Sequence, residues 1–140
     1  MSETNVLVVA MRNRVLGMNA ATGARLWQFT FPTEGFMEKI VRLAIAGDTL
    51  YAVNWRLLVC IHIPTGQVVG QVETARPPLY TPGTLLVTPD RIVLGSGAGP
   101  VQCFSREGQL LWQDDFADVE YGQVALALGD QVVQADAQPM

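Results

Sequence analysis

Few side chains in this 140-residue sequence could perform catalysis, and they are spread along the chain. His62 is the only histidine, so neither a His-based catalytic triad nor a site with several histidine ligands can be assembled. Asp114, Asp115 and Asp118 could bind calcium, but they lack the regular spacing and the glycine of a calcium loop. We therefore expect a solvated acidic connector there and no metal site.

The glycine-rich stretch 95–100 is the other place where chemistry could be expected. Its sequence, Gly-Ser-Gly-Ala-Gly-Pro, departs from the G-x-G-x-x-G spacing of dinucleotide loops and lacks the Lys-Ser/Thr pair of a phosphate loop. Ser96 also lacks the G-x-S-x-G frame of a nucleophile elbow. A flexible loop between two strands is the simpler interpretation. The sequence thus predicts no catalytic residue.

Composition and charge limit the possible partners and the compartment. The net charge is −4 and the nine Lys and Arg residues are scattered, which argues against nucleic acid. No apolar run approaches the roughly 18 residues of a membrane helix. Residues 1–5 lack the basic region of a secretory signal, so we expect a cytoplasmic protein without membrane insertion. In that compartment Cys60 and Cys103 are expected to be free thiols that pack in the core.

A turn motif that recurs at a fixed interval organises the chain. Gly23, Gly66 and Gly108 each lie between two strand-like segments and are separated by 43 and 42 residues. The residues at the matching place before these turns are Asn19, His62 and Ser105. A period in this range, flanked by strands, is typical of β-propeller blades.

Between these turns the sequence predicts short strands and no long helix. Labelled A to D within each unit, the strands read BCD, ABCD, ABCD and AB. This order predicts an all-β, propeller-type array of about three four-stranded antiparallel blades within one domain. The repeat units cover residues 5–31, 40–74, 83–116 and 121–136, all approximately.

Residues 15–27 read Val-Leu-Gly-Met-Asn-Ala-Ala-Thr-Gly-Ala-Arg-Leu-Trp and resemble the repeat of the quinoprotein-type (PQQ-like) β-propellers. A unit of that family reads as an apolar strand, then Leu-Asp-Ala-x-Thr-Gly, a short stretch and Trp. The family includes quinoprotein alcohol dehydrogenases and a lipoprotein scaffold of outer-membrane assembly. The resemblance implies that Trp27 and Trp112 wedge between neighbouring blades. It also implies that His62 replaces the Asp that bonds the turn backbone.

The chain departs from this pattern in several places. The middle unit has Gly70 where the family has Trp, and Trp55 lies off the motif and is not explained by it. The enzymes of the family carry an adjacent cysteine pair beside the quinone, together with a catalytic Asp and calcium ligands. Cys60 and Cys103 are far apart in the sequence, so we expect no cofactor.

The number of predicted strands is too small to close a propeller ring, and this points to a function. A propeller closes with four or more blades, and the units found here amount to about three and a quarter. Two chains could close a ring of roughly six blades if the strand predicted at 123–128 became strand A of the partner's first blade. The residues expected at this edge and oligomer interface are Val6, Val8, Val124, Leu126, Leu128 and Val132.

We therefore predict a non-catalytic binding or scaffold module that oligomerises to complete its ring. Its partner is then itself or another protein. One alternative is a partial propeller that completes a different protein. A quinoprotein-like enzyme fragment is the other alternative.

Overall fold

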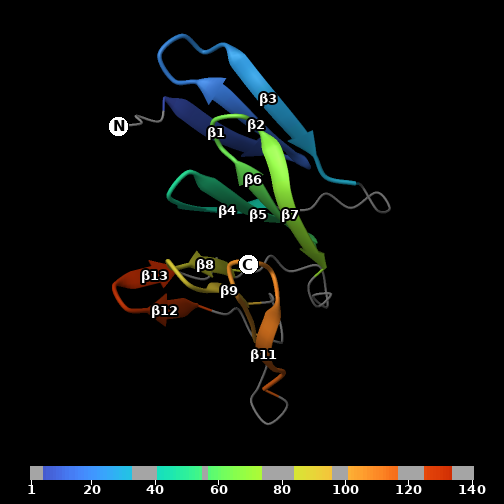
Figure 1. Cartoon of the computed structure of the whole chain (residues 1–140), viewed down its shortest axis with the longest axis vertical. Coiled ribbons are helices and arrows are strands. Elements are labelled where there is room, and N and C mark those ends of the chain that lie inside the picture. The colour runs from blue at the N-terminus through green and yellow to red at the C-terminus, as the bar shows by residue number, and fades with distance from the viewer. Residues whose placement is uncertain are drawn as a thin grey trace, which may run out of the picture.

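The computed structural model of the chain describes residues 5–32, 41–54, 57–73, 84–95, 101–116 and 125–133. These residues form thirteen strands in four antiparallel sheets, arranged as three, four, four and two strands (Figure 1). The predicted all-β class and the strand pattern BCD-ABCD-ABCD-AB are thereby confirmed. Among these residues there is no helix of the length and apolarity needed to cross a membrane.

We name the four sheets the first to fourth blades, in chain order. The first blade contains β1 (Val6–Met11), β2 (Arg14–Asn19) and β3 (Arg25–Thr30). The second contains β4 (Val41–Ala46), β5 (Thr49–Asn54), β6 (Leu57–His62) and β7 (Gln67–Glu73). The third contains β8 (Thr84–Val87), β9 (Ile92–Gly95), β10 (Val101–Phe104) and β11 (Leu110–Asp114), and the fourth contains β12 (Leu126–Leu128) and β13 (Gln131–Val133).

The turn glycines adopt backbone angles that explain why the motif repeats. Gly23, Gly66 and Gly108 have φ values of 79°, 80° and 95°, in the left-handed region where a Cβ atom is strained. In the first turn the side-chain oxygen of Asn19 accepts hydrogen bonds from the amides of Ala21 (2.9 Å) and Thr22 (3.2 Å). Each turn joins the last two strands of its blade, so it fixes their register.

A β-bulge recurs beside each of these turns. The pairing shifts by one residue after Gly17, Cys60 and Cys103, at the same place in all three blades. The residues that pair with these three across the last hairpin are Trp27, Gly70 and Trp112. The position of the motif's tryptophan is therefore set by the register of the hairpin.

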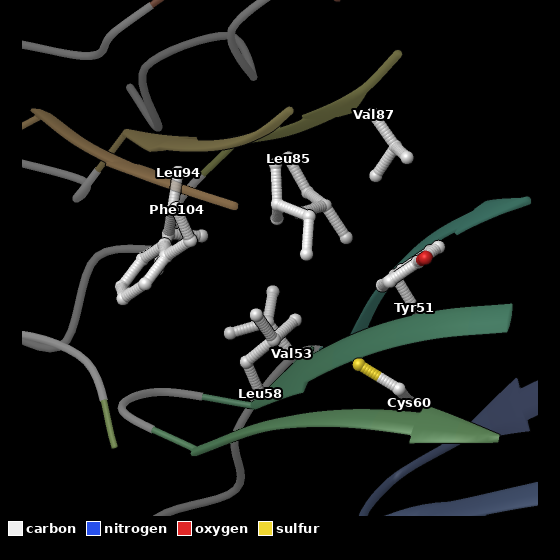
Figure 2. Close-up of a cluster of buried hydrophobic side chains, with 9 residues drawn as sticks. Tyr51, Val53, Leu58, Cys60, Leu85, Val87, Leu94 and Phe104 are labelled. Atoms are coloured by element: carbon white, nitrogen blue, oxygen red, sulfur yellow. The ribbon is translucent and has the colours of Figure 1, made fainter. Parts of the chain in front are cut away.

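The core lies between the blades. Buried apolar residues form three clusters, one at each junction between consecutive blades. Figure 2 shows part of the middle one, in which Val53 and Leu58 of the second blade face Leu85, Leu94 and Phe104 of the third. The strands nearest the centre also touch along the array, since β4 contacts both β1 and β8, and β8 contacts β12 and β13 (Figure 1).

Two predicted boundaries differ from those observed. The strand predicted at 123–128 is described only over Leu126–Leu128, with Ala125 outside it and Val124 outside the described residues. Asp114 belongs to β11 and not to the acidic connector, because it pairs with Val101. Trp55, Ser96 and Asp118 also lie outside the described residues.

Candidate functional site: the junctions between blades

The first junction is closed by Trp27. Its indole Nε1 donates a hydrogen bond to the carbonyl oxygen of Ile63 in the second blade, at 2.8 Å. The ring lies between Gly17 of its own blade and Gly66 of the next, and a Cβ atom at either glycine would overlap the indole. The two glycines thus form a slot that accepts the indole only because they lack side chains.

Gly17 is a functional residue that the sequence reasoning missed. A glycine inside a strand often marks a close approach by another group. That signal was present in the sequence. It became informative only once the register placed Gly17 opposite Trp27.

The second junction is closed differently, because Gly70 stands in the place of the tryptophan. Arg106, in the turn of the third blade, donates from Nε to the hydroxyl of Tyr51 in the second blade and from Nη1 to the Pro89 carbonyl (2.7 Å). The guanidinium carbon lies 5.2 Å from the centre of the Tyr51 ring, within cation–π range. Val72 supports the same turn, with its Cγ2 2.8 Å from where a Cβ of Gly108 would lie.

Burial raises the pKa of one tyrosine and one cysteine at this junction, and of one cysteine at the next. Burial raises the pKa of Tyr51 above its ordinary value of 10.0, and Arg106 opposes part of that rise. Burial also raises the pKa of the Cys60 and Cys103 thiols above 9.0. Both thiols are buried and unbridged, which confirms the expectation of free core cysteines. Because the thiolate is the reactive form, both are poor nucleophiles.

The third tryptophan position is open. Trp112 on β11 is 51% exposed, and its neighbours Leu110 and Leu111 are exposed as well. Trp112 pairs with Cys103 across the hairpin, so the two side chains lie on the same face of the third blade. Trp27 and Gly17 have the same relation in the first blade. The indole is therefore only partly covered on that face.

The predicted edge residues are only partly available for an interface. The side chains of Val6 and Val8 pack against the cluster between the first and second blades, whereas Leu7 and Met11 of β1 are exposed. Leu126 packs against the third blade, whereas Leu128 is exposed. Val124 and the side chain of Val132 lie outside the described residues.

The remaining polar candidates have local roles. The His62 ring bonds the Thr65 hydroxyl through Nδ1 (3.0 Å) and faces the Asp48 carboxylate through Nε2 (3.4 Å), in place of the turn backbone expected for it. Asp114 accepts from the Phe116 amide (2.8 Å) and Asp115 accepts from the Gln113 side chain (2.8 Å).

The described residues do not fit a quinone cofactor or a metal ion. No group of three or more His, Cys, Asp and Glu side chains among them could hold a metal. Cys60 belongs to the cluster between the second and third blades, while Cys103 belongs to the cluster between the third and fourth. They therefore lie on different sheets and do not form the adjacent pair found beside the quinone.

Comparisons with known proteins agree with this architecture. The sequence matches a family described as outer membrane protein assembly factor BamB over residues 1–139. A comparison with curated proteins gives no match. Among solved structures, BamB from Moraxella catarrhalis is 18% identical with a TM-score of 0.61, covering 91% of this chain and 37% of that one.

Two further structures share the fold. A europium-containing methanol dehydrogenase is 16% identical with a TM-score of 0.62, covering 79% of this chain and 23% of that one. The computationally designed Ika8 protein is 17% identical with a TM-score of 0.68, covering 94% and 40%. This chain thus spans less than half of each. The resemblance to PQQ-type propellers is confirmed, and at these identities the structures support the fold alone.

The slot around Trp27 generates a stability prediction. Gly66→Ala places a Cβ atom inside the indole, so it should displace Trp27 and break its bond to Ile63. Gly47→Ala is the matched control, since Gly47 also has a positive φ (64°) but open space around it. Both variants lose about 1–2 kcal/mol of stability because alanine is strained at a positive φ. Urea unfolding should show Gly66→Ala less stable by a further 2 kcal/mol or so; equal losses would contradict the slot.

The raised pKa values generate a pH prediction. Tyr51, Cys60 and Cys103 bind their protons more tightly in the folded state than in the unfolded state. Their contribution to the free energy of unfolding is therefore complete below their unfolded pKa values and is lost as pH rises through their folded pKa values. The free energy of unfolding should therefore fall above about pH 9. Tyr51→Phe should flatten the decline above pH 10 and cost about 1 kcal/mol at pH 7 through the lost Arg106 bond. Urea titrations at several pH values test this, and an unchanged slope in Tyr51→Phe would contradict it.

Proposed function

This chain belongs to the family of the outer membrane protein assembly factor BamB, and from that premise we propose that it is a non-catalytic β-propeller scaffold that binds proteins, its own copies included. The proposal is supported by the surfaces left open on the first and third blades. Scaffolds of this kind act through faces and connectors and need no reactive group.

The single observation that carries the proposal is apolar surface on the first blade and on the last strand of the third blade. On the first blade, Leu7 and Met11 are more than half exposed. On the third blade, Leu110, Leu111 and Trp112 follow one another along β11, and all three are exposed. Leu110 and Trp112 lie on opposite faces of β11, because they pair with Phe104 and Cys103 on either side of the bulge. Large apolar side chains left exposed at these places support protein association.

The backbone at one end supports the same proposal. In the described part of the chain, β1 pairs with β2 on one side only, although the second and third blades carry a further strand at that position. An open edge presents unpaired amide and carbonyl groups that another strand can satisfy. We propose that oligomerisation supplies that strand and completes the ring.

A different protein as partner is the alternative that an observation favours. The chain spans 37% of the length of the Moraxella BamB structure, so another polypeptide could supply the remaining blades. A quinoprotein-like enzyme fragment is less well supported, because the two cysteines lie in separate blades.

The cytoplasm is the compartment we propose. Both thiols are free and buried, which suits a reducing environment. Cell fractionation with detection of the native chain should recover it with cytoplasmic markers, and recovery with membranes would contradict the proposal.

Self-association is tested by light scattering over a dilution series. We expect a particle of twice the 15.2-kDa chain mass at micromolar concentration, which dissociates on dilution. A folded monomer at every concentration would contradict self-association. Poor solubility that is corrected by co-expression with a different protein would replace it with the alternative.

A further inference from the structure

We propose that Trp112 of one copy docks against the Gly23 turn of a second copy, reproducing between chains the contact that Trp27 makes within the chain. This inference rests on the proposed self-association and names the residues that form it. The third blade carries the inserted side chain, and the first blade carries the turn that receives it.

Trp112 repeats Trp27 in its local setting. Each is the residue that pairs with the position before the β-bulge, Cys103 in one case and Gly17 in the other. Trp27 has its neighbour and is half-buried with its indole bonded, whereas Trp112 is 51% exposed. The two side chains therefore share a hairpin position, although Cys103 stands beside Trp112 where Gly17 stands beside Trp27, so only the turn side of the contact is reproduced without a side chain.

The Gly23 turn repeats the Gly66 turn and is unoccupied. Their φ values, 79° and 80°, are the same within a degree. A Cβ built on Gly66 would overlap Trp27, and one built on Gly108 would meet Val72. Nothing lies within 4 Å of the Cβ built on Gly23. Of the three turns, only this one has an open slot.

The acceptor for the indole also has a counterpart. Trp27 donates to the carbonyl of Ile63, the residue that follows His62. The residue that follows Asn19 at the matching place is Ala20, which is exposed. Its carbonyl group is therefore the expected acceptor for the Nε1 of Trp112.

A second copy is the occupant because the inserted side chain and the slot are both present once on this chain. With two copies, each Trp112 meets the Gly23 turn of the other, which gives two identical junctions and a closed ring of about six blades. Leu7, at the outer face of the first blade, is then covered by the third blade of the partner.

Two strands compete for one place in each shared blade. This place is that of strand B, next to the innermost strand of a blade. It is occupied by β1 in the first blade and by β13 in the fourth. β1 pairs with β2 over six residues, while β13 pairs with β12 over three. Because the β1–β2 pairing is longer, it is retained in the shared blade. β12 then becomes the innermost strand beside β1 of the partner, and β13 is displaced.

The test uses one variant at each side of the contact, with a matched control for each. Trp112→Ala removes the inserted side chain, and Leu111→Ala removes exposed apolar surface beside it. Gly23→Asn fills the slot with a residue that tolerates a positive φ, and Gly47→Asn makes the same change at an open turn away from it. The dimer dissociation constant should rise about 30-fold or more for the first variant of each pair and less than about 5-fold for its control.

Mixing the two variants distinguishes the loss of this contact from a failure to fold. Trp112→Ala keeps the slot and Gly23→Asn keeps the tryptophan, so the two variants should form a 1:1 heterodimer through one intact junction. Native mass spectrometry of the mixture and of each variant alone measures this, with the mixture expected to bind at least tenfold more tightly than either variant alone.

The outcomes distinguish this contact from self-association in general. A dimer that survives both Trp112→Ala and Gly23→Asn, or that Leu111→Ala weakens as much as Trp112→Ala, overturns the contact and leaves the proposed function standing. Two monomeric variants that do not combine on mixing also overturn it. A wild-type chain that is monomeric at every concentration overturns the self-association on which the contact rests.

Discussion

The second blade of this protein is apolar on both faces, and the rest of the structure depends on that constraint. Consecutive residues of β5 show it. Leu50 is fully buried against the first blade, while Tyr51, which points the other way, is buried against the third. A sheet of this kind removes its apolar area from water only when it lies between two others, since each face gains about 25 cal/mol per Å² buried. Stacked blades are therefore the stable unit, and a single blade is not.

The junctions show that the chain has two ways to fix neighbouring blades in orientation. The first uses an indole held between two glycines and bonded to a backbone carbonyl. The second has Gly70 in that place, whose added Cβ would be 3.9 Å from the nearest atoms of Cys60. There Arg106 crosses to Tyr51 and so supplies the polar contact that the absent indole would have made. The apolar clusters provide most of the attraction between neighbouring blades, and these polar contacts fix the orientation of one blade relative to the next.

The sequence predicted the strands well because they follow the period of the turns. All thirteen strands occur, and the three turn glycines that mark the period have a positive φ. The sequence did not show which face of β1 is covered. Alternation assigns residues to two faces, but when both faces are apolar it cannot tell which one is covered within the chain. The predicted interface therefore includes Val6 and Val8, which pack against the second blade, and omits the exposed Leu7.

The Arg106–Tyr51 contact was beyond sequence reasoning for a different reason. Its residues are 55 positions apart, and neither belongs to the repeated motif. The matching residues of other blades differ, with Val8 and Val93 in the place of Tyr51. Contacts that break the repeat leave no periodic signal, and only the assembled blades reveal them.

Trp27 and Trp112 show how one motif can have two roles. Both occupy the same hairpin position beside the same bulge, yet one closes a junction inside the chain and the other faces solvent. The local sequence fixes how the indole is presented, and the neighbouring blade decides whether it is buried. In a repeat architecture, a side chain selected for internal packing therefore becomes a binding surface wherever its blade lacks a neighbour. The assembly that we propose for this protein uses the same kind of contact that holds its blades together.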